Sequence, residues 1–163
     1  MSNHPLWHNL FRDDKDWIKN GAELCKDNPL FAGISANAIR WMVSRMHLRS
    51  YEKGERVFNM GNPGVGAVLL LSGEISIMAD QVELAHLHHG DLFGEVALVT
   101  GQPRTAEAVA LTDCDALFFL RSDLKEWMEH RPKQAARLLI NLAEMLAQRL
   151  LETNRQLAAR DTA

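Results

Sequence analysis

The sequence lacks the features that mark secreted and membrane-spanning proteins. Its 163 residues include only two cysteines, Cys25 and Cys114, which lie far apart and match neither a disulfide framework nor a zinc-binding spacing. No apolar run is long enough to span a bilayer, and the amino terminus has no basic head followed by an apolar run. We therefore expect a cytoplasmic protein with no membrane partner.

An excess of positive charge is also absent. The chain has 18 basic and 21 acidic residues, a formal net charge of -3 at pH 7 with neutral histidines. A protein that binds nucleic acid by itself usually carries a basic patch, so we expect no nucleic-acid partner. With 47% hydrophobic residues, a chain of this length can bury one core but hardly two.

Helical periodicity is confined to the two ends of the sequence. Loosely spaced apolar residues from Asp13 to Lys26 predict a first helix, and Ser35 is a good N-cap for a second. After Ser122 the period is helical again, first as far as Pro132 and then in a long final segment. That segment carries a stripe with the spacing of one helix face: Leu139, Leu142, Leu146, Leu150, Thr153 and Leu157. Two interpretations stay open: the final helix packs along its own domain, or its far part pairs with a second copy.

The middle of the chain predicts a β structure. Short runs of valine, leucine, isoleucine and phenylalanine follow Arg49, separated by turn glycines, and this texture is typical of a barrel or jelly roll. We expect a mainly β fold with α: a β-jelly roll flanked by N-terminal helices and a long C-terminal helix. The expected divisions are an N-terminal helical extension at 1–27 and a ligand-binding domain at 28–163, with the barrel at about 48–121 and C-terminal helices at about 122–160.

The segment "GDLFGEVALVTGQPRTAEAVA" combines groups that suit a sugar phosphate. Gly94 lets a ligand approach the main chain, and free amides at the start of a short helical turn attract an anion. Arg104 can bind a pair of phosphate oxygens through charge-assisted hydrogen bonds. Glu95 repels a phosphate, so its partner is either a ligand hydroxyl or, when the site is empty, Arg104.

The motifs "FGEVAL" and "PRTA" resemble the phosphate-binding cassette of cyclic nucleotide-binding domains, as in the catabolite-activator family and protein kinase regulatory subunits. The resemblance extends from about Asn28 to Asn154 and includes "NPLFAGIS", "YEKGERVFNMG", "LLLSGEISI" and "LFFLRSDL". It implies that Gly94 and the amides of Glu95, Val96 and Ala97 hold a cyclic phosphate. It further implies that Glu95 accepts a hydrogen bond from the ribose 2'-hydroxyl and that Arg104 neutralises a phosphate oxygen.

The same resemblance implies contacts to the rest of the ligand. Thr105 lies where family members contact the phosphate or a guanine, and Thr153 and Asn154 fall near a pair that touches the base in catabolite-activator proteins. A hydroxyl residue after the arginine is common in relatives that respond to cAMP. The expected effector is therefore cAMP, with cGMP as the alternative.

Two departures from the family pattern affect the expected function. Val65 and Gly66 stand where many relatives have a polar or acidic residue, and we expect this change to alter a loop more than the pocket. The sequence ends at Ala163 without the winged helix-turn-helix of the transcription factors. The expected function is a stand-alone regulatory module, not an enzyme, which signals to an unknown protein partner by moving its C-terminal helix.

An alternative of a different class stays open. The chain could be a ligand-free interaction module, a homodimer formed through the C-terminal helix, in which Glu95 and Arg104 make a structural ion pair. Other residues receive structural interpretations. His86 and His88 share one strand face, but no third ligand with suitable spacing follows, so we expect no metal site. Cys114, between two aspartates, is expected to be inert.

The tryptophans are interpreted as packing residues rather than as platforms for a base. They are Trp7, Trp17, Trp41 and Trp127. All four lie in helical or terminal segments outside the phosphate-binding motifs.

Overall fold

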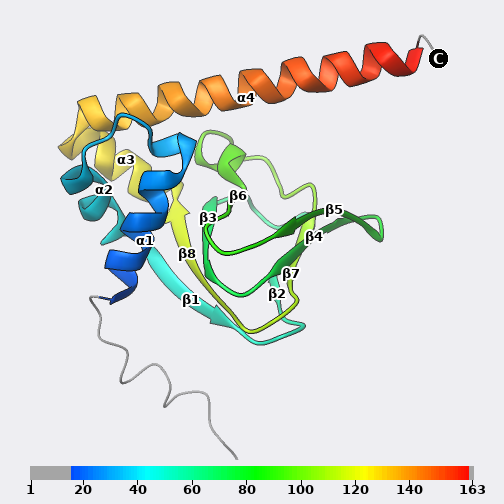
Figure 1. Ribbon diagram of the computed structural model, residues 1–163, viewed down its shortest axis with the longest axis horizontal. Helices are drawn as coiled ribbons and strands as arrows, with labels where there is room; N and C mark the ends of the chain where they lie inside the picture. Colours follow the sequence, from blue (N-terminus) through cyan, green and yellow to red (C-terminus); the bar gives the residue numbers. More distant parts are fainter. Residues whose placement is uncertain (1–15, 162–163) are drawn as a thin grey trace, which may run out of the picture.

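Two four-stranded antiparallel sheets form the body of the computed structural model, which describes residues 16–161 (Figure 1). The first sheet has the order β1-β8-β3-β6 and the second the order β2-β7-β4-β5. The strands are β1 (His47–Tyr51), β2 (Arg56–Phe58), β3 (Gly66–Ser72), β4 (Ile75–Ala79), β5 (Val82–Leu87), β6 (Leu92–Phe93), β7 (Glu107–Ala110) and β8 (Cys114–Leu120). The expected jelly-roll architecture is confirmed.

The burial of strand β3 shows that the first sheet is covered on both of its faces. Its residues from Gly66 to Leu71 are all buried, because successive side chains point to opposite faces and both faces are covered. Ala67, Leu69 and Leu71 belong to a core shared with the helices, whereas Val68 and Leu70 belong to a core between the two sheets. One strand therefore joins both cores.

The helices cover the outer face of the first sheet (Figure 1). They are α1 (Asp16–Asp27), α2 (Ala36–Val43), α3 (Arg121–His130) and α4 (Pro132–Asp161), with a short 3-10 turn η2 (Pro29–Phe31) between α1 and α2. The Ser35 hydroxyl accepts a hydrogen bond from the amide of Ala38, which confirms the predicted N-cap. The predicted start of the first helix, Asp13 to Lys15, lies outside the described residues, as does Trp7.

Helix α4 has a packed part and an uncovered part. Ala135, Leu138 and Leu142 are fully buried, and Leu146 still packs against the helix-side core. From Ala147 to Arg160 every residue is exposed, and Figure 1 shows the end of the helix reaching beyond the two sheets. Packing along its own domain thus accounts for the first half of the leucine stripe only.

Both cysteines are free of disulfide bonds, and both are buried. Burial raises the pKa of the Cys25 thiol to about 12, because the thiolate would lose its hydration. Among the described residues, no helix combines the length and the apolar character needed to cross a membrane.

A buried amide fixes the start of α4 to the loop before α2. Asn141 Nδ2 donates to the carbonyl oxygens of Leu30 at 2.9 Å and Ala32 at 2.8 Å. Both amide protons are therefore used, and two backbone carbonyls are satisfied away from water.

We expect Asn141→Ala to lower the free energy of unfolding by about 1–3 kcal/mol, because the two carbonyls would lose their donor in a buried site. Urea denaturation followed by circular dichroism measures this change. Asn154→Ala, an exposed position on the same helix, is the matched control and should leave stability within about 0.5 kcal/mol of the parent. Equal effects of the two substitutions would contradict the anchoring role.

Candidate functional site

The segments with the sequences "FGEVAL" and "PRTA" line one side of a cavity of about 290 Å³. The cavity lies beside the 3-10 turn η3 (Glu95–Leu98), which follows β6, and beside the loop that precedes β7. Its lining residues are Phe58, Ile77, Phe93, Gly94, Glu95, Val96, Ala97, Thr100, Gln102, Pro103, Arg104, Thr105, Ala106 and Arg149. Six of the eight residues expected at a ligand site are among them.

Two features favour glycine at position 94: its backbone conformation and the position of the Arg104 side chain. The φ of Gly94 is +69°, in the left-handed region that favours glycine. A Cβ atom at this position would lie 2.4 Å from Arg104 Nη1, which is closer than real Cβ contacts allow. The absence of a side chain at Gly94 therefore leaves the space that the Arg104 guanidinium occupies.

Arg104 is held in place by backbone carbonyls and an aromatic ring. Its Nη2 donates to the carbonyl oxygen of Gly66 at 2.7 Å, and its Nη1 lies 3.4 Å from that of Gly94. The guanidinium carbon stands 4.3 Å from the centre of the Phe58 ring, a cation–π contact. Strand β7 begins at Glu107, so Arg104 lies in the loop that precedes it.

The positive charge of Arg104 has no acidic partner among residues 16–161. Burial lowers the pKa of this guanidinium, because the charged form loses hydration, but an arginine stays protonated at neutral pH. Among the described residues, no carboxylate lies within ion-pairing distance of it. A half-buried cation whose partners are neutral dipoles attracts an anion to the cavity.

Glu95 is paired with a residue that the sequence did not indicate. Its carboxylate is 2% exposed and receives a hydrogen bond from Arg149 Nη1, which reaches it from α4. The expectation that Glu95 and Arg104 pair in an empty site, or as a structural ion pair, is therefore wrong for the described residues. The carboxylate is instead neutralised from α4, and Arg149 becomes part of the cavity wall.

Arg121, at the start of α3, holds the far end of the η3 segment. Its Nε and Nη2 donate to Ala97 O at 3.0 and 2.9 Å, and Nη2 also donates to Gly64 O at 2.5 Å and to Thr100 O. Sequence reasoning gave Arg121 no role.

Carbonyl groups of the loop before β3 and of the first residue of β3 accept hydrogen bonds from the two arginines. Gly66 O accepts from Arg104, and Gly64 O accepts from Arg121, whose own amide donates to Val65 O at 2.8 Å. The departure from the family pattern at Val65 and Gly66 therefore affects residues that touch the site through backbone atoms. The expectation that this change alters the loop more than the pocket stays a prediction.

The remaining expected site residues divide into two groups. The Val96 and Thr105 side chains line the cavity, whereas the Ala97 amide is used within the turn, donating to Gly94 O at 3.1 Å. Thr153 and Asn154 are exposed on α4 and do not line the cavity. The Thr153 hydroxyl donates to Arg149 O at 2.9 Å in the preceding turn.

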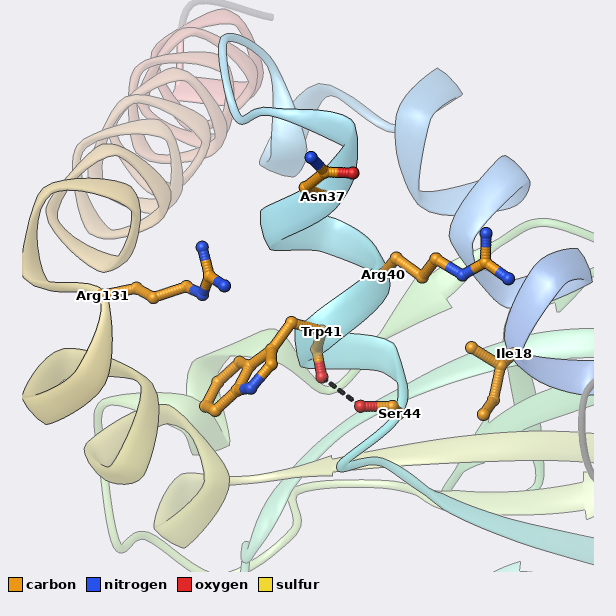
Figure 2. Close-up of a pocket in the computed structure, with 6 residues that line it drawn as sticks. All are labelled: Ile18, Asn37, Arg40, Trp41, Ser44 and Arg131. Carbon is orange, nitrogen blue, oxygen red and sulfur yellow. Dashed lines mark hydrogen bonds between the residues drawn. The ribbon is translucent and has the colours of Figure 1, made fainter.

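A second hollow, of about 430 Å³, lies between α1, α2 and the junction of α3 and α4 (Figure 2). It is lined by Ile18, Asn37, Arg40, Trp41, Ser44 and Arg131. The guanidinium carbons of Arg45 and Arg131 stand 5.2 and 5.7 Å from the centre of the Trp41 ring. Although this hollow is larger than the cavity beside η3, none of the residues of "FGEVAL" or "PRTA" lines it. The Trp41 indole packs against the Arg45 and Arg131 guanidinium groups, in agreement with its interpretation as a packing residue.

His86, on β5, and His88, just after it, have a third possible ligand nearby. Glu74, twelve residues before His86, places Oε2 2.9 Å from His86 Nε2, and His88 lies beside them. The sequence expectation concerned ligands that follow the histidines, whereas Glu74 precedes them. The β4–β5 hairpin reverses the chain, so that His86 pairs opposite Ser76 and lies beside Glu74.

A family model described as "Cyclic nucleotide-binding domain" matches residues 48–131. The chain belongs to the cyclic nucleotide-binding domain family. The matched region contains Gly94, Glu95, Arg104 and Arg121, and it ends before Arg149.

Curated relatives and solved structures agree with this assignment. The chain is 32% identical to the "Cyclic AMP receptor protein" of Thermus thermophilus, covering 81% of this chain and 62% of that protein. It is 32% identical to "Glutaminase 1" of Bradyrhizobium diazoefficiens, covering 78% of this chain and 21% of that protein. A solved cyclic nucleotide-binding domain from Methylobacillus flagellatus superposes with a TM-score of 0.75 at 25% identity, covering 90% of this chain and 85% of that one. The chain thus spans about three fifths of the Thermus protein and about a fifth of the glutaminase.

We expect Arg149→Met to lower the free energy of unfolding by about 1–2 kcal/mol. Removing one partner of a fully buried pair costs about 3–5 kcal/mol, but the Arg149 side chain is 58% exposed and solvent screens the pair. Adding Glu95→Gln to Arg149→Met should recover part of the loss, because no unpaired charge then stays buried. Urea denaturation of the four proteins of this cycle measures the coupling.

Arg155→Met is the control for the Arg149 substitution, since Arg155 pairs with the exposed Glu152 on the same helix. It should change stability by less than about 0.5 kcal/mol. Additive effects of the Glu95 and Arg149 substitutions would show that the two side chains do not interact.

Proposed function

We propose that this protein is a regulatory module that binds a cyclic nucleotide, with cAMP as its effector. The observation that carries the proposal is the half-buried Arg104, which faces the cavity beside a buried carboxylate and has no acidic partner among the described residues. The arrangement of Arg104 and Glu95 in the cavity suits a ligand with a single negative charge and a neighbouring hydroxyl donor. A ribose cyclic phosphate has both.

Each group of the ligand has a partner in the cavity. The phosphate would lie against Arg104 and the amides at the start of η3, where Gly94 leaves the main chain accessible. Glu95 would accept a hydrogen bond from the ribose 2'-hydroxyl. Thr105, in the loop before β7, would contact the phosphate. The similarity to the Thermus and Mycobacterium tuberculosis proteins, which are named for cAMP, supports cAMP over cGMP.

The signal would pass through α4. Thr153 and Asn154 do not line the cavity in the described structure, so contact with the base requires α4 to move toward it. Arg149 already joins α4 to Glu95, one of the proposed ligand groups. A ligand that engages Glu95 would change this contact and shift the position of the helix by its differential affinity for the two arrangements.

Isothermal titration of nucleotide-free protein with cAMP and with cGMP tests the proposal. We expect tighter binding of cAMP, and a loss of about 2–5 kcal/mol in Arg104→Ala, because the phosphate would lose its charge-assisted partner. That loss corresponds to about 30-fold to several-thousand-fold in Kd. Gly94→Ala should also weaken binding, since its Cβ would displace the guanidinium.

Arg56→Ala is the matched control for Arg104→Ala. Arg56 lies on β2 in the same sheet as β7, but it pairs with Glu107, 3.3 Å away, and does not line the cavity. It should bind cAMP like the parent protein. Absence of binding to either nucleotide by the folded parent protein would reject the proposal.

A second candidate function is homodimerisation through the uncovered half of α4, alone or together with nucleotide binding. Leu150, Leu151 and Leu157 are 61%, 49% and 53% exposed there, and exposed leucines at helical spacing favour a helix–helix contact. A protein that dimerises but binds no nucleotide would be the ligand-free interaction module.

The double substitution Leu150→Glu and Leu157→Glu should convert a dimer into a monomer, because it places charges in the proposed apolar seam. Analytical ultracentrifugation measures the change. Leu84→Glu, on β5 and also 61% exposed, is the control and should leave the mass unchanged. A parent protein that sediments as a monomer with and without cAMP would reject dimerisation.

A further inference from the structure

Three side chains that can bind metal gather near one edge of the second sheet, outside the cavity. Glu74 lies in the turn between β3 and β4, His86 lies on β5, and His88 follows that strand. One ligand atom from each lies within 4.8 Å of the others. We propose that Glu74, His86 and His88 form a binding site for a divalent transition metal, with Zn²⁺ as the best match.

The strand geometry brings the two imidazoles together. Residues two apart on a strand point to the same face, and the rings of His86 and His88 are stacked with centroids 4.7 Å apart and an interplanar angle of 13°. Ligand atoms around one tetrahedral Zn²⁺ are about 3.4 Å apart, given bond lengths of about 2.1 Å. Because both histidines are exposed, small rotations of their side chains can close the difference.

A second carboxylate supports the orientation of His86. The Nε2 atom of His86 faces Glu74, whereas its Nδ1 lies 3.8 Å from Glu83 Oε1. The other oxygen of Glu83 accepts a 2.5 Å hydrogen bond from the buried hydroxyl of Ser76. Metal-binding histidines commonly direct their second nitrogen to a carboxylate, and Glu83 stands where it can fill that role.

The charge around the cluster favours a cation. Glu74 and Glu83 have only His86 as an ion-pairing partner among residues 16–161, and no lysine or arginine there neutralises them. Imidazole ligands select Zn²⁺, Cu²⁺ or Ni²⁺ over Mg²⁺ and Ca²⁺, which prefer oxygen ligands. Two imidazoles and one carboxylate leave a fourth position of Zn²⁺ for water.

The proposed metal site is separate from the nucleotide cavity. Ser76 and Ile77 are neighbours on β4 and point to opposite faces; Ile77 lines the cavity, while Ser76 contacts Glu83 beside the histidines. A metal ion would join the β3–β4 turn to the end of β5, which is the edge strand of its sheet. Failure of metal binding would therefore leave the proposed nucleotide function untouched.

Isothermal titration of the full chain with ZnCl₂ tests the proposal. We expect one Zn²⁺ per chain, weakened by more than about tenfold in His86→Gln, His88→Gln and Glu74→Gln, since each loses a ligand. His47→Gln is the matched control, because His47 is also exposed but lies away from Glu74, His86 and His88, with its Nε2 3.3 Å from Asp123 Oδ2. This substitution should leave the affinity for Zn²⁺ unchanged. MgCl₂ should give no comparable binding.

A spectroscopic measurement on the parent protein identifies the ligands without any substitution. Long-range ¹H–¹⁵N spectra of the histidine side chains should show ring-nitrogen shifts for His86 and His88 on adding one equivalent of Zn²⁺, and little change for His47 and His130. The absence of saturable Zn²⁺ binding would overturn the proposal. So would binding that survives both histidine substitutions with unchanged affinity.

Discussion

The arrangement of the cavity depends on one half-buried positive charge, the guanidinium of Arg104. Its hydrogen-bond partners are the carbonyl oxygens of Gly66 and Gly94, and the Phe58 ring packs against it. Carbonyl dipoles and a ring fix its orientation without cancelling its charge. A carboxylate in the same place would have satisfied the cation and removed the attraction for an anion. The neutral partners therefore keep the site available for a ligand.

Two arginines near the site use the same carbonyl chemistry for different purposes. Arg121 directs Nε and Nη2 to the carbonyls of Gly64, Ala97 and Thr100, and it does not line the cavity. It positions the segment after η3 against the loop before β3. Arg104 has fewer backbone partners and lines the cavity. The number and direction of the bonds, rather than the residue type, separate the positioning arginine from the one that lines the cavity.

Local patterns in the sequence predicted much of the fold and the residues of the cavity that lie within one short segment. Alternation, turn glycines and the Ser35 cap depend on residues close in sequence, and the structure confirms the jelly roll and the cap. The motif around Gly94 and Arg104 was visible because its members lie within one short segment.

The partners of those residues were not predicted, because they lie far away in the chain. Arg149 meets Glu95 across 54 positions, Arg121 meets Gly64 across 57, and Asn141 meets Leu30 across 111. Each contact depends on where the fold places a helix against a loop, which no local spacing encodes. Glu74 was missed for the same reason at shorter range, since a turn reverses the chain between it and His86.

The position of Arg149 on α4 gives the proposed regulation a physical basis. Leu146 is the last residue of α4 that packs against the core, and Arg149 lies less than one turn beyond it, where the helix leaves the domain. The ion pair with Glu95 therefore links the start of the uncovered half of the helix to the cavity. A ribose hydroxyl bound to Glu95 would have to share or replace this contact, so occupancy of the cavity and the position of α4 are coupled. By linkage the coupling is reciprocal: a partner that holds the uncovered half of α4 in the ligand-bound position would tighten nucleotide binding by the same factor.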